Sequence, residues 1–301
     1  MINTFAGFMA VVFWSLSIPL SRSLTEKLGS FHTAGLACLI GGSLPVLYYL
    51  AVHRSQFRTL LKFSPKYLWI CGSTFILYLV SLYIAIGMAA TRQQIVEVGL
   101  INYLWPTFIL VFSIPILKYR ATPWLALGIM ISLSGIVMAD ASMNKEDFSL
   151  QNLTDNIGNN FLPYFFALVA AITWSIYSNF ASLYAGLSSK LTIPLFLFAS
   201  GIVLEILSFS FHEKAAWDMT TSIELLVLAV FPCVLAYIFW DMAMRKGNVI
   251  LVTSFSYLTP LFSVIATGIY LGVTLVTGVW IACALVIAGA VICNFSMKKK
   301  A

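Results

Sequence analysis

The sequence predicts an all-α membrane protein, with ten transmembrane helices that form two inverted five-helix repeats around a central cavity. Three observations support this fold class. The 301 residues are 60% hydrophobic and only 9% charged, whereas soluble domains carry about 25% charged residues. The hydrophobic residues gather into runs long enough to cross a bilayer, and the two halves of the chain share short matching stretches. These runs use nearly the whole length, which leaves no room for a soluble catalytic domain.

Ten apolar runs are bounded by charged or turn residues, and each is long enough to span the hydrocarbon core as a helix. In chain order the predicted spans are 3–21, 31–52, 66–89, 95–117, 122–140, 161–185, 190–211, 222–244, 248–271 and 275–297. The first run has neither a basic leader nor a small-residue cleavage site, so we expect a retained span and not a signal peptide. Most connections are short, which makes neighbouring spans antiparallel.

The one long connection is polar, and it divides the chain into five spans plus five. We therefore expect a first five-helix repeat in residues 1–140, an extracytoplasmic linker loop at 141–160 and a second five-helix repeat in residues 161–301.

Basic residues set the expected orientation, because loops rich in Lys and Arg stay in the cytoplasm. With the N-terminus inside, twelve of the 17 basic residues fall in cytoplasmic segments: Arg54, Arg58, Lys62, Lys66, Lys118, Arg120, Lys190, Arg245, Lys246, Lys298, Lys299 and Lys300. The others are Arg22, Lys27, Arg92, Lys145 and Lys214. Both termini are therefore expected in the cytoplasm, and the net charge of +6 indicates topology and not nucleic-acid binding.

The halves resemble each other at three places. Phe13–Ser15 matches Thr173–Ser175, Asn102–Pro106 matches Ser256–Pro260, and Ser134–Val137 matches Ala288–Val291. The last two matches share one offset of 154 residues. Because each half has an odd number of spans, the second half must insert upside down. Inverted repeats are typical of transporters with a substrate site near the midplane, although convergence of apolar sequence is the alternative.

The fourth span contains the most unusual stretch, Glu97–Pro106. It places a carboxylate, a carboxamide, two polar-tipped aromatic side chains and a proline where lipid offers no partners. Pro106 lacks a backbone N–H and clashes with the preceding turn, so a kink is predicted there and at the matching Pro260. A kinked, polar membrane helix is typical of a transport site. The alternative is a packing kink in which Tyr103 and Trp105 only fill the bundle.

Three carboxylates lie well inside predicted spans: Glu97, Glu205 and Asp241. Burial of a charge in hydrocarbon is costly, so each should be neutralised, hydrated or paired. Asp241 shares a helix face with Tyr237, but Arg245 one turn further on offers a salt bridge at the end of the span. Both interpretations stay open. Glu205 lies in the aliphatic stretch Val203–Leu207, which makes it the weakest functional candidate.

Aromatic residues make up 15% of the chain. Those near span ends, Trp69, Trp124 and Trp217, fit the aromatic belts of membrane interfaces. The deeper ones are Trp14, Tyr78, Tyr103, Trp105, Trp174, Tyr177, Tyr237 and Tyr257. A cavity lined by such rings suits flat apolar or cationic solutes. For any single ring, the core of the bundle remains the alternative.

Nothing in the sequence favours an enzyme. All five cysteines lie in apolar runs without CxxC spacing, which is typical of structural filler. The three histidines fall near span ends, and no HExxH, P-loop or Ser/His/Asp grouping occurs in the spans. We expect no catalytic residues, no metal ion and no cofactor.

Ten spans in a five-plus-five repeat, with Trp14-Ser15 and Trp174-Ser175 in equivalent spans, resemble the drug/metabolite transporter superfamily of EamA type. Glu97-Val98-Gly99 followed by Asn102–Pro106 is more specific and resembles span four of bacterial aromatic amino-acid exporters. The likeness in length and span layout covers essentially the whole chain. It implies an exporter of aromatic and other neutral amino acids, or of flat organic cations, in a bacterial inner membrane.

The resemblance also implies a cavity between spans one, three, four, six, eight and nine that opens alternately to each side. Residues of this chain on those spans are Trp14, Tyr78, Glu97, Asn102, Tyr103, Trp105, Trp174, Tyr177, Tyr237, Asp241 and Tyr257. At span four the assignment of these residues rests on a direct match to the family's motif. On the other spans it rests only on their position in the order of spans. Rings would hold the substrate side chain, Asn102 and tyrosine hydroxyls its polar ends, and Glu97 its ammonium group or a proton. Span nine has Ser256 and Thr259 where span four has Asn102 and Trp105, so the two walls differ.

Two other classes of function stay open. One is a carrier of the same superfamily for another solute, such as a drug, a sugar phosphate or a nucleotide sugar. Phosphorylated solutes are disfavoured because no basic residues are evident in midmembrane. The other is a multi-pass membrane enzyme or a structural subunit. The partners we expect are a small-molecule substrate, which is an amino acid, and the lipid bilayer, with no nucleic acid, and we expect the protein to function as a monomer.

Overall fold

The computed structural model of the protein describes residues 2–54, 64–143, 150–187, 190–271 and 277–299. Its first half contains α1 (Ile2–Ser15), α2 (Ser17–Leu28), α3 (Ser30–Val52), α5 (Pro65–Tyr67), the π-helical turn η1 (Leu68–Gly72), α6 (Ser73–Gly87), α7 (Arg92–Asn102), α8 (Trp105–Leu117), β1 (Tyr119–Ala121) and α9 (Trp124–Met143).

The second half begins with α10 (Leu150–Asn159), α11 (Phe161–Leu183) and the 3-10 turn η2 (Ala185–Leu187). It continues with α12 (Thr192–Ser210), α13 (Met219–Leu228), the π-helical turn η3 (Ala229–Leu235), α14 (Ala236–Lys246), α15 (Val249–Ser256), α16 (Thr259–Leu271), α17 (Thr277–Ser296) and β2 (Met297–Lys299). The described chain is therefore almost entirely helical.

Six helical stretches in the described residues are long and apolar enough to cross a membrane. They are Ser30–Val52, Pro65–Gly87, Glu97–Leu117, Phe161–Leu183, Thr192–Ser210 and Met219–Lys246. Shorter apolar helices occupy Ile2–Ser15, Trp124–Met138 and Trp280–Ser296. The helical membrane fold predicted from the apolar runs is thus confirmed at this level, because every long helix coincides with a predicted span.

Three of the predicted spans are broken helices. The first is interrupted at Leu16, between α1 and α2. In the fourth, Tyr103 N donates to Gly99 O and Leu104 N donates to Ile101 O, so the chain tightens just before Pro106. The missing N–H of that proline leaves the Asn102 carbonyl without its usual helical donor.

The ninth predicted span breaks in the same way. Its helices α15 and α16 are separated at Tyr257 and Leu258, two residues before Pro260. This break lies 154 residues after the one between α7 and α8. Each of these two breaks is therefore followed by a proline at the same spacing, Pro106 after the first and Pro260 after the second.

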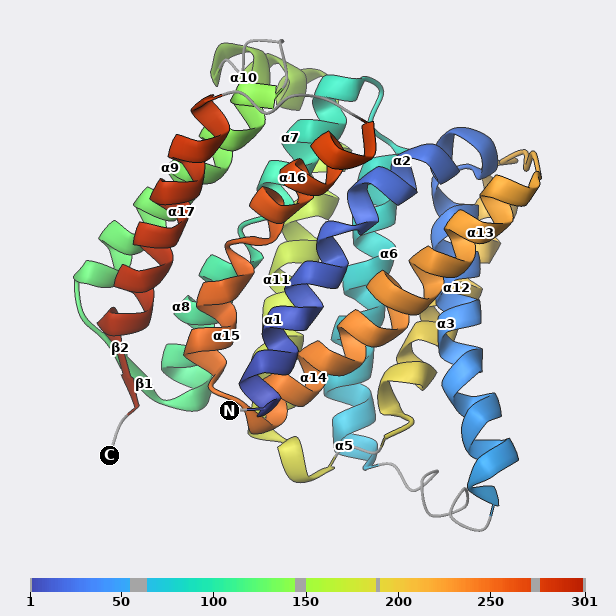
Figure 1. The fold of residues 1–301 in the computed structure, drawn as a ribbon, viewed down its shortest axis with the longest axis horizontal. Helices are drawn as coiled ribbons and strands as arrows, with labels where there is room; N and C mark the ends of the chain where they lie inside the picture. Colours follow the sequence, from blue (N-terminus) through green and yellow to red (C-terminus); the bar gives the residue numbers. More distant parts are fainter. Residues whose placement is uncertain (1, 55–63, 144–149, 188–189, 272–276, 300–301) are drawn as a thin grey trace.

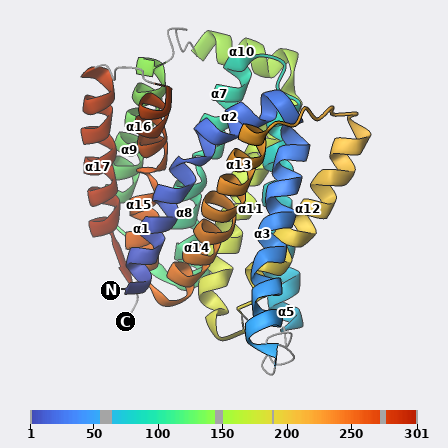
Figure 2. The same ribbon diagram turned by 45° about the vertical axis from the view of Figure 1, so that its right-hand side comes forward.

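Helix packing joins the two halves throughout the molecule. The strongest pairings are α9 with α17, α3 with α12, α6 with α11, α1 with α14, and α8 with α11. The pair α9 and α17 forms one edge of the bundle, and α3 and α12 form the other (Figures 1 and 2). Helices α1, α6, α8, α11 and α14 lie between these edges, so the core of the bundle is made from both halves.

Both chain termini lie at the same end of the bundle, which we call the termini end; the opposite end, covered by α10, is the α10 end (Figure 1). The termini end carries α5, β1, β2 and the end of α14, which are rich in the basic residues counted above. Of those basic residues, Arg58, Lys62, Lys145 and Lys300 lie outside the described part of the chain.

A two-stranded antiparallel sheet at the termini end departs from the all-α expectation. Strand β1 pairs with β2, with Tyr119 opposite Lys299 and Ala121 opposite Met297. Lys118 turns the chain out of α8 with a left-handed φ of 59°. The sheet ties the end of the chain to the connection between α8 and α9.

At the α10 end, the connection between α1 and α3 is joined to the connection between α12 and α13. Lys27 Nζ lies 2.7 Å from Asp218 Oδ2, and Ala216 N donates to Lys27 O. Asp218 also caps α13 by accepting from Thr221 N at 2.6 Å. The hydrogen bond from Lys27 and the two from Thr221 lower the pKa of the Asp218 carboxyl below its usual range.

This ion pair predicts a defined pH dependence of stability. Because the folded pKa of Asp218 is depressed, its contribution should be fully present above the ordinary pKa of about 4 and be lost as pH falls further toward the folded value. We expect Asp218→Asn to lower the melting temperature at pH 7 and the difference from the wild type to shrink below about pH 4. Thermal unfolding in detergent at several pH values measures this. Glu26→Gln, at an exposed position on α2, is the control, and an equal loss there would contradict the assignment.

Candidate functional site

Eight aromatic side chains meet in the interior of the bundle, and we call them the aromatic cluster. Its members are Trp14 from α1, Phe75 and Tyr78 from α6, Trp105 from α8, Trp174 and Tyr177 from α11, and Tyr237 and Trp240 from α14. They come from five helices and from both halves. The structure thus brings together six of the residues predicted from the sequence.

Trp174 lies at the centre of the aromatic cluster and is only 1% exposed. Its ring centroid lies 4.7 Å from that of Tyr78 and 5.6 Å from that of Trp14. It also contacts Phe75, Trp105, Tyr177, Tyr237 and Trp240. Edge-to-face and tilted pairs at these separations are favourable, so the rings form one continuous aromatic surface.

Two buried polar atoms, one in the cluster and one three residues before Trp105, have no hydrogen-bond partner among the described residues. They are Trp14 Nε1, a donor, and Asn102 Oδ1, an acceptor. Asn102 ends α7 at the break before α8, one turn before Trp105. Buried polar atoms are rarely left unpaired, because doing so costs free energy. This donor and this acceptor are therefore available to a ligand.

Asp241 lies at the side of the aromatic cluster that faces the termini end. Its Oδ1 accepts from Tyr67 and from Tyr177, each at 3.0 Å. Its Oδ2 accepts from Arg245 Nε at 2.7 Å. The salt bridge that sequence left open is present, and Asp241 is also hydrogen-bonded by two tyrosines from distant parts of the chain.

Glu97 lies apart from the rings, toward the α10 end. It accepts hydrogen bonds from the Tyr164 hydroxyl and from Asn156 Nδ2 at 3.1 and 3.2 Å. Trp105 follows it by eight residues, which include the break between α7 and α8 and would rise about 12 Å in a continuous helix. Its side chain is buried beneath α10 and the start of α11, so it and Asp241 occupy opposite ends of the aromatic cluster.

Glu205, which has aliphatic neighbours in the sequence, has a partner from another span. Its Oε2 lies 2.8 Å from His32 Nδ1, across the seam between α3 and α12. Its other oxygen is buried without a partner among the described residues. This carboxylate is therefore paired inside the protein with a side chain from another helix.

Tyr103 and Tyr257 belong to a second hydrophobic cluster, near α17 and away from the central rings. The Tyr257 hydroxyl lies 2.9 Å from Thr107 Oγ1 on α8. These two candidates therefore flank the broken helices, and the structure does not place them with Trp174.

Sequence reasoning missed Phe75 and Trp240. The missed signal is helical spacing, because Phe75 precedes Tyr78 by three residues, as Trp174 precedes Tyr177 and Tyr237 precedes Trp240. Residues three apart on a helix share a face. Three such pairs on three helices could have identified the wall of the cluster.

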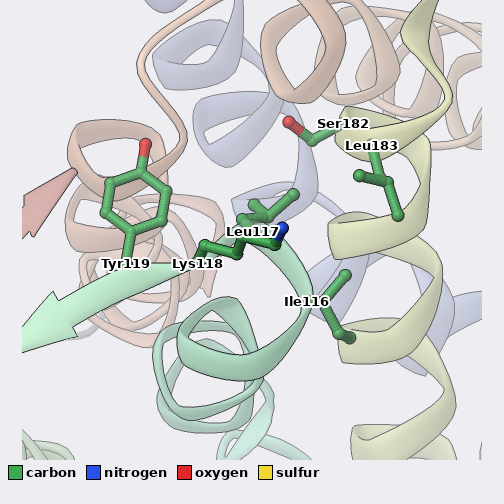
Figure 3. Close-up of a pocket in the computed structure, with 6 residues that line it drawn as sticks. All are labelled: Ile116, Leu117, Lys118, Tyr119, Ser182 and Leu183. Carbon is green, nitrogen blue, oxygen red and sulfur yellow. The ribbon is translucent and has the colours of Figure 1, made fainter. Parts of the chain in front are cut away.

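A surface pocket of about 390 Å³ opens at the termini end, where α8 and α11 separate. It is lined by Ile116, Leu117, Lys118, Tyr119, Ser182 and Leu183, and the hydroxyls of Tyr119 and Ser182 and the Lys118 amine supply its polar groups (Figure 3). Deeper in the bundle, Ser175 Oγ donates to Trp105 O and Asn179 Nδ2 donates to Ile109 O, which hold the same two helices together. The pocket therefore lies on the termini side of this seam.

Among the described residues, no group of three or more His, Cys, Asp or Glu side chains is arranged to hold a metal ion. The five cysteines are free and buried. Cys38 and Cys233 are neighbours, with sulfur atoms 3.8 Å apart.

A broken-helix bundle with a central aromatic cluster defines a membrane transporter, and the comparisons with known proteins agree. The model of the EamA-like transporter family matches residues 1–139 and 161–295. The chain therefore belongs to the EamA-like transporter family.

Within that family, the chain is similar over its full length to named exporters. It is 28% identical to the aromatic amino acid exporter YddG of Salmonella typhimurium, over 99% of this chain and 98% of that protein. It is likewise 28% identical to the aromatic amino acid exporter YddG of Escherichia coli, over 98% of each chain. A solved crystal structure covers 98% of this chain and 96% of its own, with a TM-score of 0.82 at 24% identity, which shows the same fold.

Proposed function

We propose that this protein exports aromatic and other neutral amino acids from the cytoplasm by alternating access. The observation that carries the proposal is the aromatic cluster beside a helix break, with an unpaired donor and an unpaired acceptor buried next to it. The full-length similarity to exporters named for aromatic amino acids supports the substrate class.

The proposed framework is ten spans in two inverted five-helix repeats, with both termini in the cytoplasm of a bacterium and the α10 end outside. If each span of the first repeat is exchanged with the span five positions later in the second repeat, the observed helix pairings are reproduced. The α9–α17 pair and the α3–α12 pair are each unchanged by this exchange. The α6–α11 pair becomes the α14–α1 pair, which is also observed. The matching breaks and the π-helical turns in spans three and eight agree with this symmetry. Alternating access then follows from the rocking of one repeat against the other.

The ring contacts define how such a protein would hold an aromatic side chain. A substrate ring can insert between Trp14, Tyr78, Trp105 and Trp174 and replace ring–ring contacts with equivalent contacts of its own. Aromatic pairs add about 0.5–1.5 kcal/mol each beyond the burial of apolar area. Because contacts between protein rings are replaced by contacts with the substrate ring, little interaction energy is lost on binding. Smaller neutral side chains would make fewer such contacts and bind less tightly.

The polar ends of an amino acid complement the polar atoms that the protein leaves unpaired. Trp14 Nε1 donates only and suits the carboxylate, whereas Asn102 Oδ1 accepts and suits the ammonium group. The free carbonyl at the end of α7 and the positive N-terminal end of α8 provide the same two polarities. A zwitterion is therefore matched at both ends without a buried unpaired charge.

The function is tested with purified protein in proteoliposomes loaded with unlabelled phenylalanine, by the entry of radiolabelled phenylalanine. We expect saturable, protein-dependent exchange. Asn102→Leu removes the acceptor at similar volume, and it should raise the half-saturating concentration by about 10- to 100-fold, the value of a hydrogen bond to a charged group. Tyr257→Phe, which loses a hydroxyl near the same break but outside the aromatic cluster, is the control.

A pH gradient across the vesicles separates a facilitative carrier from a proton-coupled one, because only the second follows the gradient. If no amino acid exchanges while a flat organic cation does, the protein is a drug carrier of the same family and the amino-acid proposal fails. Equal affinity of Asn102→Leu and the wild type would remove Asn102 from the site.

A further inference from the structure

The hydrogen bonds of Asp241 join three helical segments that are far apart in the sequence. Tyr67 comes from α5 in the first half, Tyr177 from α11 in the second half, and Asp241 from α14. All three side chains are buried. They meet at the side of the aromatic cluster that faces the termini end, so they lie between most of its rings and that end.

The ion pair and the hydrogen bonds of Asp241 stabilise the contact between these three segments. The Asp241 charge is balanced by Arg245 at 2.7 Å, and its oxygens also accept two tyrosine hydroxyls. A buried charge is tolerated when it is paired and fully hydrogen-bonded. Each donor that leaves the carboxylate weakens that balance, so the segments are held together most firmly when all of them are in place.

A second contact joins two of the same spans at the same end. Lys66 Nζ lies 4.6 Å from the centre of the Tyr184 ring. Lys66 neighbours Tyr67 on α5, and Tyr184 follows the C-terminal end of α11. Movement of α5 away from both the end of α11 and α14 therefore breaks this cation–π contact together with the hydrogen bond from Tyr67 to Asp241.

The hydrogen-bond network of Asp241, which includes Tyr67, Tyr177 and Arg245, also contacts the rings of the aromatic cluster. The Tyr177 ring centroid lies 5.2 Å from that of Phe75 and 5.1 Å from that of Trp174. Tyr237 and Trp240 precede Asp241 on α14 and belong to the cluster. Any movement of Asp241 or Tyr177 therefore moves rings of the cluster as well.

We propose that Asp241, Tyr67, Tyr177 and Arg245 form the inner gate of the transporter, and that Tyr67 leaves Asp241 whenever the aromatic cluster opens to the cytoplasm. Asp241 is then a positioning residue that acts through the two tyrosines, and not a ligand of the substrate. The proposal rests on the proposed function for the direction of transport, but the closure of the termini end can be measured without any substrate.

Cys71 is a natural reporter of this gate. It lies one helical turn after Tyr67, in η1, and is fully buried. In a chain with alanine at Cys38, Cys233, Cys283 and Cys293, a membrane-impermeant thiol reagent can reach only Cys71. The rate of its labelling in inside-out membrane vesicles measures how often the termini end opens.

Tyr67→Phe removes one hydroxyl from Asp241 and keeps the ring and the ion pair. We expect it to speed labelling of Cys71 about tenfold, the effect of one lost hydrogen bond to a charged group. Asp241→Asn should act in the same direction, with the Tyr67 variant as the conservative comparison should Asp241→Asn fail to fold. Tyr164→Phe is the matched control, because it removes one hydroxyl from Glu97 at the opposite end and should leave the rate unchanged in these vesicles.

Unchanged labelling in folded Tyr67→Phe protein, or equal acceleration by Tyr164→Phe, would overturn the gate. Faster labelling only in right-side-out vesicles would place the termini end outside and overturn it as well. Phenylalanine exchange by the wild-type protein is measured separately. If Tyr67→Phe speeds labelling of Cys71 as expected but the wild-type protein exchanges no amino acid, the proposed substrate is refuted and the gate is supported. If the wild-type protein exchanges phenylalanine but Tyr67→Phe leaves labelling unchanged, the gate is refuted and the proposed substrate is supported.

Discussion

Replacement of Trp174 with alanine is expected to abolish phenylalanine exchange and to lower the free energy of unfolding by about 3–5 kcal/mol. Trp174 is buried and touches the seven other rings of the aromatic cluster. Loss of its ring leaves a cavity at the point where the five helices meet. The surrounding rings can collapse only in part, because each is held by its own helix.

Two further variants separate the loss of stability from the loss of the site. Trp174→Phe keeps a ring at the centre, so it should restore most of the stability while binding a substrate ring less well. Trp124→Ala removes an indole that is 65% exposed on α9, and it should change neither exchange nor unfolding appreciably. Unfolding is followed by thermal denaturation in detergent, and exchange by radiolabelled phenylalanine. Wild-type exchange in Trp174→Ala would show that the aromatic cluster is only packing core.

Replacement of Gly289 with valine is the second large effect that we expect. A Cβ at Gly289 would lie 2.5 Å from Ser132 N and 2.6 Å from Gly128 O. Both are backbone atoms of α9, which cannot rotate away as a side chain would. Helices α9 and α17 must therefore separate, at a cost above the usual 1–3 kcal/mol of overpacking, and the melting temperature should fall sharply.

Gly158→Ala is the matched control for this prediction, because nothing lies within 4 Å of a Cβ built at that position. It should leave the melting temperature unchanged or slightly raised, since alanine favours a helix. A melting temperature of Gly289→Val equal to that of the wild type would show that α9 and α17 do not pack backbone to backbone. Measurement of exchange on any folded Gly289→Val protein then shows whether this edge of the bundle also contributes to transport.

Two of the buried carboxylates, Glu97 and Asp241, show how much could be predicted from the sequence. Their position inside apolar runs predicted that Glu97 and Asp241 must be neutralised or paired, and both accept hydrogen bonds inside the protein. Their partners could not be predicted. Tyr164 is 67 residues from Glu97, and Tyr67 is 174 residues from Asp241. A charge in an apolar run demands a partner but carries no information about which distant helix supplies it.

The His32–Glu205 pair shows the same limit. The two residues are 173 positions apart and meet because α3 packs on α12. The residues next to Glu205 in the sequence are aliphatic, so the local sequence alone made it the weakest candidate. Pairings between helices depend on the fit of two surfaces, and a single helix specifies only one of them.

The sequence by itself determined the helical membrane fold, the positions of most spans, the interruption near Pro106 and the presence of many buried rings. These properties follow from local physics, since an apolar run must bury its backbone polar groups in a helix and a proline cannot continue one. Only the tertiary structure decided which rings meet, that Phe75 and Trp240 join them, and that Asp241 and Glu97 occupy opposite ends of the cluster. Those outcomes depend on close packing between distant segments, where shape and hydrogen-bond geometry select one arrangement from many with the same hydrophobic pattern.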